Sequence, residues 1–95
     1  MSQDDQSGAR WWETAEDHRF ALEVLQLGIR RKMLKFIGSG IRTKEEIARE
    51  FGLRDEQAGY HLTLLEKALV VEHVKGYYKA TSTGIFYLEN VEAKR

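Results

Sequence analysis

The sequence predicts a mainly α-helical domain with one small β-hairpin. Three observations predict this fold class. Apolar residues recur at helical spacing through most of the chain, glycines divide these stretches, and two β-prone runs joined through Lys75-Gly76 interrupt the series once. At 95 residues, the chain is expected to form a single domain over residues 11–95.

The first ten residues and the helix that follows them differ sharply in character. The stretch 1–8 is polar and small, which predicts a disordered tail over residues 1–10. Residues 14–27 contain no helix breaker, and apolar side chains lie on more than one side of the predicted helix. A helix of that kind is buried from two directions.

Three more helices are expected before the hairpin, at about residues 29–38, 43–51 and 55–68. Glycines separate them, and Thr43 with Glu46 has the spacing of a capping box. The hairpin is expected at 70–81 and a last helix at 82–92. Two short helices joined by a tight turn and followed directly by a hairpin describe a winged helix-turn-helix.

Composition excludes several function classes. The chain has no cysteine, so disulfides, a thiolate nucleophile and cysteine-based metal sites are absent. The three histidines lie in different predicted elements, and no residue spacing resembles a catalytic or cofactor-binding motif. We therefore expect no enzyme activity, metal or cofactor. Without an apolar run long enough to span a bilayer or a secretory signal, we expect a cytoplasmic protein with no membrane partner.

The net charge of zero is an average over segments of opposite sign. Residues 21–50 hold seven Lys and Arg against four Glu, a net of +3, whereas residues 1–20 have a net of −3. The basic stretch includes Arg42 and Lys44 at the start of the predicted helix-turn-helix, which this fold presents to a DNA backbone, whereas the basic run at 30–35 is expected to be solvated. The charge pattern is therefore compatible with nucleic-acid binding even though the overall charge is not basic.

The winged helix predicts double-stranded DNA as the partner, with helix 55–68 in the major groove and the hairpin on the backbone. The side chains expected to contact DNA are Arg42, Lys44, Arg54, Gln57, Tyr60, Thr63, Lys75 and Lys79. His61 is expected to pack beside helix 43–51 instead. One of the neighbouring Tyr77 and Tyr78 should face the core and the other solvent or DNA, because side chains alternate along a strand.

The stretch from Leu27 to Leu88 resembles the ArsR-type winged-helix transcriptional regulators. The matching segments are 30–35, 43–48, 52–53, 60–65 with Ala68, 77–79 and 81–84. The resemblance implies a homodimer that binds specific DNA sequences, with dimer contacts from the first and last helices. Two departures stand out: Asp55 and Glu56 open the recognition helix, and the metal-sensing cysteines of that family are missing.

Apolar side chains near both ends of the domain exceed what one small core can bury, which predicts a homodimer. The expected interface residues are Trp11, Trp12, Phe20, Val24, Ile85, Phe86 and Leu88. The same region could hold an apolar small-molecule effector near the tryptophans. The alternative function is a winged helix that binds another protein through its acidic recognition helix and has little or no affinity for DNA.

Overall fold

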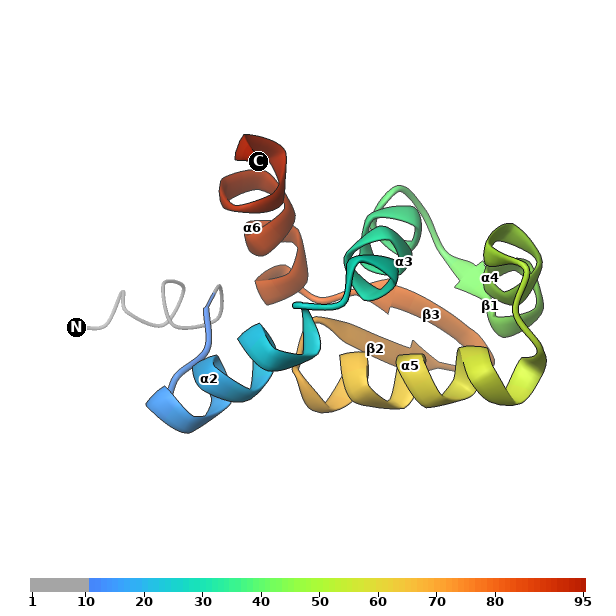
Figure 1. The fold of residues 1–95 in the computed structure, drawn as a ribbon, viewed down its shortest axis with the longest axis horizontal. Coiled ribbons are helices and arrows are strands. Elements are labelled where there is room, and N and C mark those ends of the chain that lie inside the picture. Colours follow the sequence, from blue (N-terminus) through green and yellow to red (C-terminus); the bar gives the residue numbers. More distant parts are fainter. Residues whose placement is uncertain (1–10) are drawn as a thin grey trace.

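The structure, a computed structural model, describes residues 11–95; the predicted tail at 1–10 lies outside the described residues. The elements in chain order are α2 (Ala15–Val24), α3 (Gly28–Gly38), β1 (Arg42–Thr43), α4 (Lys44–Phe51), α5 (Asp55–Lys67), β2 (Val71–Val74), β3 (Tyr77–Ala80), α6 (Ser82–Asn90) and a 3-10 turn, η1 (Glu92–Lys94) (Figure 1). This arrangement is a winged helix-turn-helix, so the predicted fold class is confirmed.

The main difference in the helices is where the first one ends. The sequence predicts a helix that reaches residue 27, but α2 ends at Val24, and Leu25 to Leu27 form a turn into α3. Arg31 stabilises this turn, because its Nη1 donates to the carbonyl oxygens of Leu25 at 2.6 Å and Gln26 at 2.9 Å. The apolar periodicity runs through the turn because Leu25 is buried there.

The hairpin belongs to a three-stranded antiparallel sheet in the order β1-β3-β2. β1 was not predicted from the sequence because two residues are too few for an alternating pattern. β2 and β3 are joined by a two-residue turn in which Lys75 has φ 53° and Gly76 has φ 85°. Two successive positive φ angles give a turn whose twist matches that of the strands, which fixes the pairing of Val74 with Tyr77.

The core lies between the helices and the inner face of the sheet. Its largest fully buried side chains are Met33, Leu34, Ile37, Ile47, Leu62, Leu65, Val70 and Tyr87. Trp12 joins this core and donates its indole N–H to the carbonyl oxygen of Ala68 at 2.6 Å, which attaches the start of the described chain to the end of α5. One side of α5 is therefore committed to the core.

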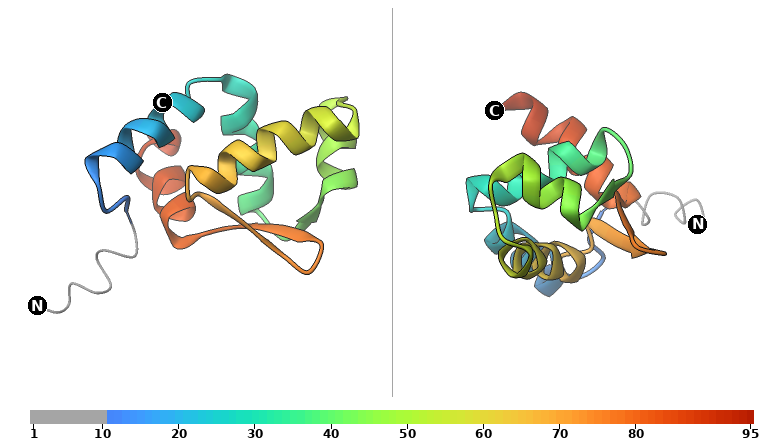
Figure 2. Two further views of the ribbon diagram at one scale, coloured as in Figure 1. Left: turned by 90° about the horizontal axis from the view of Figure 1, so that it is seen from below. Right: turned by 90° about the vertical axis from the view of Figure 1, so that its right-hand side faces the viewer.

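The orientation of α4 is fixed at both ends. The Thr43 hydroxyl accepts from the N–H of Glu46 at 3.1 Å, and the Glu46 carboxylate accepts from the N–H of Thr43 at 2.8 Å, which confirms the capping box. Gly52 ends the helix at φ 65°. The short turn after it leads directly into α5, and the hairpin projects beside α5 in the view from below (Figure 2).

Candidate nucleic-acid interface

The outward face of α5 is the central feature of the candidate interface. Ala58, Leu62 and Leu65 are buried against the core, whereas Gln57, Tyr60, Thr63 and Lys67 are exposed. Positions 57, 60 and 63 are spaced by three residues and therefore share one side of the helix. Tyr60 is 61% exposed, which is unusual for so large a ring in a folded domain. This face can contact a partner without rearrangement of the fold.

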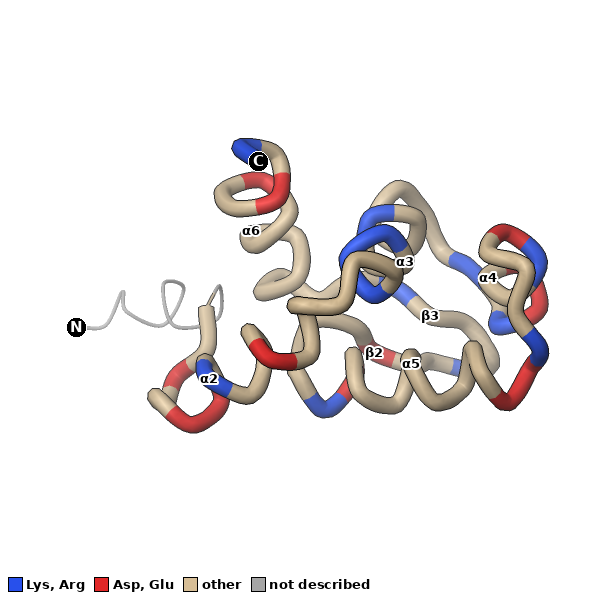
Figure 3. Tube along the Cα trace, in the orientation of Figure 1, with Lys and Arg blue, Asp and Glu red and all other residues tan. Residues whose placement is uncertain are grey.

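The first turn of α5 is acidic and exposed. Asp55 and Glu56 form no ion pair with another described residue, and their charge lies at the right-hand end of α5 in Figure 3. The Gln57 side-chain oxygen accepts from the backbone N–H of Arg54 at 2.9 Å, so it caps the helix. The Gln57 amide NH2 group has no hydrogen bond within the described residues, and the Gln57 and Arg54 side chains are both exposed.

The hairpin presents two lysines to solvent. Lys75 occupies the tip of the turn, and Lys79 forms an exposed ion pair with Glu72 on the neighbouring strand at 3.9 Å. Tyr78 is buried while Tyr77 is 50% exposed, so the predicted alternation of the two tyrosines is confirmed. Both lysine side chains are exposed.

Arg42 and Lys44 lie next to the start of α4, as predicted, but their surroundings differ. The Arg42 guanidinium donates to the Phe36 carbonyl oxygen at 3.1 Å and to Ser39 Oγ at 2.8 Å, and it lies 3.9 Å from the centre of the Phe36 ring. It thereby closes the C-terminal end of α3. Lys44 is the first residue of α4 and is half-buried.

Arg30 has a role that the sequence does not reveal. The basic run at 30–35 suggests solvated positions, but Arg30 is only 9% exposed. Its Nε donates to His61 Nδ1 on α5 at 3.0 Å, and its guanidinium lies 5.7 Å from the centre of the Tyr60 ring. His61 therefore packs against α3, and its expected position beside helix 43–51 is corrected. No local sequence signal marks this contact, because the two partners lie 31 residues apart.

His61 should make stability depend on pH. Burial, and then the positive charge of Arg30, hold the pKa of His61 below its usual value of 6.5. The unfolded chain therefore binds the proton more tightly than the folded chain. The resulting stability is fully present above pH 6.5 and is lost as the pH falls below 6.5 toward the lowered folded-state pKa.

Urea unfolding at pH 8 and pH 5.5 measures this effect. His61→Asn keeps a side-chain acceptor near the position of Nδ1 but cannot be protonated, so its free energy of unfolding should fall less between the two pH values. The two proteins differ at position 61 alone, so contributions from the rest of the chain cancel in the comparison. Equal pH dependence in both would contradict the assignment.

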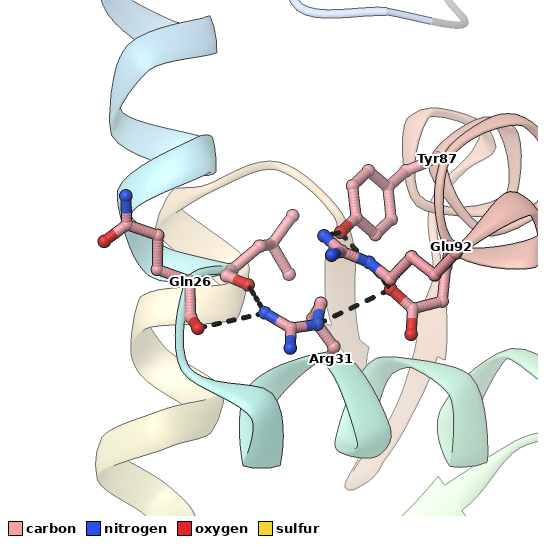
Figure 4. A network of polar contacts seen from close by, with 6 residues as sticks. Gln26, Arg31, Tyr87 and Glu92 are labelled. Atoms are coloured by element: carbon pink, nitrogen blue, oxygen red, sulfur yellow. Dashed lines mark hydrogen bonds and ion pairs between the residues drawn. The ribbon is translucent and has the colours of Figure 1, made fainter.

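Arg31 and the two lysines of the same basic run have different roles from Arg30. Besides its bonds to the α2–α3 turn, the Arg31 Nε lies 3.6 Å from Glu92, which also accepts from Arg95 at 2.8 Å (Figure 4). This network attaches η1 to the joint between α2 and α3. Lys32 and Lys35 are exposed. One basic run therefore contains a buried cation, a structural clamp and two solvated side chains.

The residues expected at a dimer interface fall into two groups. Trp12 and Val24 are buried in the core of the single chain, at 6% and 3% exposure, so they have little surface to offer a second chain. The others are partly exposed; they are Trp11, Phe20, Ile85, Phe86 and Leu88. Trp11 packs edge-on against Phe86 with 5.1 Å between ring centres, so the start of the described chain and α6 form one aromatic surface.

Two classes of feature are absent from residues 11–95. No helix there is both long and apolar enough to cross a membrane. No cluster of three or more His, Asp or Glu side chains in that part of the chain could hold a metal ion.

Comparison with known proteins supports the fold. No protein-family model and no curated protein matches the chain. A solved structure does: the homodimeric winged helix-turn-helix DNA-binding domain of Mb0332 from Mycobacterium bovis, described as a possible ArsR-family transcriptional regulator. The TM-score is 0.72 and the identity 24%, over 83% of this chain and 80% of the other. The chain therefore has the winged helix-turn-helix fold of this neighbour.

Proposed function

We propose that the protein is a non-enzymatic, homodimeric transcriptional regulator that binds specific sequences of double-stranded DNA. The observation that carries this proposal is the exposed face of α5 formed by Gln57, Tyr60 and Thr63. In a winged helix-turn-helix, the second helix of the motif enters the major groove. Here that helix is buried on one side only, and the hairpin lies beside it (Figure 2).

The proposed contacts divide into two kinds. Gln57, Tyr60 and Thr63 face the bases, because they are exposed on the outward face of α5. Phosphate contacts come from cations at the start of α4, before α5 and on the hairpin, which are Arg42, Lys44, Arg54, Lys75 and Lys79. Phosphate contacts fix the position of the protein on DNA, and base contacts provide the specificity.

Asp55 and Glu56 are chemically compatible with such binding. A carboxylate at the end of a recognition helix can accept a hydrogen bond from the N4 amino group of cytosine. Arg54 immediately precedes them and is exposed, so a cation stands next to both carboxylates. On this proposal the acidic turn favours particular base pairs and opposes non-specific attraction to the backbone.

The proposed dimer uses the surface of Trp11, Phe20, Ile85, Phe86 and Leu88. These side chains are partly exposed, and the neighbouring Leu22 is 44% exposed. Apolar side chains gathered at one end of a small domain favour association. Light scattering should give twice the chain mass of 11.0 kDa, and a monomer at micromolar concentration would contradict the dimer.

A direct test of DNA binding is a fluorescence anisotropy titration with mixed-sequence duplex DNA at low salt. We expect saturable binding at micromolar protein, because non-specific affinities of such proteins are about 1–100 μM at physiological salt and tighter at low salt. No binding at tens of micromolar protein would reject DNA as the partner.

Lys75 and Lys79 should contribute affinity without sequence preference. Replacing both with alanine should weaken binding to every duplex and reduce the slope of log affinity against log salt by about 1 for each phosphate that the variant no longer neutralises. The fold should be unaffected, because both side chains are exposed. Lys32→Ala with Lys35→Ala on α3 is the matched control. An unchanged slope for the hairpin variant would remove the hairpin from the interface.

A second candidate function has one observation in its favour. Asp55 and Glu56 are exposed and unpaired among the described residues, and the chain has no net charge. A basic protein partner would be attracted to this end of α5. If the titration with mixed duplex DNA shows no binding, this surface becomes the favoured binding site.

A further inference from the structure

Arg30 is a buried cation with an unusual environment. It is 9% exposed, yet no ion pair joins it to a carboxylate among the described residues. Its partners are neutral or aromatic: His61 Nδ1 at 3.0 Å, the Val24 carbonyl oxygen at 3.4 Å and the Tyr60 ring at 5.7 Å. Buried charges in proteins are usually paired, so a position of this kind calls for a specific reason.

The contacts of Arg30 converge on two consecutive residues of α5. His61 lies on the inner flank of the helix and Tyr60 on the outward face, with 5.6 Å between their ring centres. The Arg30 side chain of α3 therefore donates a hydrogen bond to His61 and packs against the ring of Tyr60. This contact restricts rotation of α5 about its own axis and the position of the Tyr60 ring at the same time.

The bond from Arg30 requires a neutral His61. An imidazole nitrogen can accept a hydrogen bond only while it carries no proton, and a protonated ring would place two cations in contact. The groups that face His61 are Arg30 from α3 and Tyr60 on α5 itself. Arg30 is the charged group whose field lowers the pKa of His61.

The charge of Arg30 also offsets that of α5. The helix contains Asp55, Glu56 and Glu66 against Lys67, a net of −2. Arg54 at its start and Arg30 beneath its middle supply the two balancing positive charges. Because Arg30 is not neutralised by a carboxylate, its field extends to the outward face near Tyr60.

We propose that Arg30 is a positioning residue for sequence readout: with neutral His61 it fixes Tyr60 and the rotation of α5 in the major groove. This inference rests on the proposed function. Protonation of His61 releases the contact, so it lowers affinity for the preferred sequence more than affinity for mixed DNA. Loss of Arg30 has the same consequence at any pH.

The experiment measures the specificity ratio, which is the affinity for the preferred duplex divided by that for mixed duplex, at pH 7.5 and pH 5.5. The preferred duplex is the one enriched from a random pool. We expect the wild-type ratio to fall at pH 5.5, because this pH is below 6.5 and nearer the lowered pKa of His61, so more of the rings are protonated than at pH 7.5. His61→Asn should have a ratio that does not change with pH. His18→Asn, on α2, is the matched control and should behave as wild type.

The ratio distinguishes positioning from a simple effect of charge, because an added positive charge near DNA raises both affinities. Arg30→Met should have a low ratio at both pH values, and circular dichroism checks that it is folded. If Arg30→Met does not fold, the specificity ratios of His61→Asn and wild type at the two pH values still test the inference. A wild-type ratio independent of pH, or an equal fall in His61→Asn, would overturn the inference. Absence of all DNA binding would instead reject the proposed function on which this inference rests.

Discussion

Replacing Gly84 with alanine is expected to destabilise the fold by about 3 kcal/mol or more. Gly84 lies in the first turn of α6, and an added Cβ would overlap the carbonyl oxygen of Val70. That oxygen accepts from the N–H of Thr81 at 3.0 Å, and Thr81 in turn caps α6. Backbone lies on both sides of the overlap, so α6 would have to move away from the end of α5. The midpoint of urea unfolding should fall by about 2 M.

Gly59→Ala is the matched control, because it makes the same chemical change in a different environment. Gly59 lies inside α5, and an added Cβ would meet no atom within 4 Å. Alanine in a helix interior is more favourable than glycine by about 0.5–1 kcal/mol, so this variant should be more stable than wild type. An equal loss of stability in both variants would contradict the explanation that Gly84 is required by its close approach to Val70.

Thr63→Glu is expected to have the largest effect on DNA binding, a loss of about 100-fold in affinity for the preferred sequence. Thr63 is exposed in the middle of the outward face of α5, and its side chain forms no hydrogen bond with another described residue. A carboxylate there would enter a groove lined with phosphates and would displace a base contact. The free energy of unfolding should change by no more than about 0.5 kcal/mol, because the position is on the surface.

Gln26→Glu is the control for this change, because it adds the same charge at the exposed turn between α2 and α3. Its affinity should stay close to that of wild type at moderate salt, since the position is in the turn between α2 and α3 and not on the outward face of α5. Anisotropy titrations of the two variants against one duplex give the comparison. Equal losses would mean that net charge governs binding, and α5 would not be the reading element.

Local patterns in the sequence were sufficient to predict most of the fold. The capping box of Thr43 and Glu46, the glycine after α4 and the Lys75-Gly76 turn all act within a few residues, so their effects can be read along the chain. β1 could not be predicted in this way. It exists because Arg42 and Thr43 pair with β3, which is 34 or more residues away in the chain.

The candidate site was less predictable for the same reason. Arg30 and Lys35 belong to one basic run, and only the packing of α5 decides that the first is buried and the second exposed. The apolar character of Trp12 and Val24 predicts contact with a second chain. The core of their own chain covers them instead, because Trp12 reaches the end of α5. Surface positions on α5 were easier to identify, since helical spacing alone places 57, 60 and 63 on one side.

The central claim is that α5 of each chain in a dimer reads a specific DNA sequence. Sequencing of the duplexes that the protein enriches from a random pool tests it most directly. The account predicts an enriched motif with two related half-sites whose centres lie about 10–10.5 base pairs apart, the spacing of one helical turn. A pool that shows no enriched motif after selection would contradict the account.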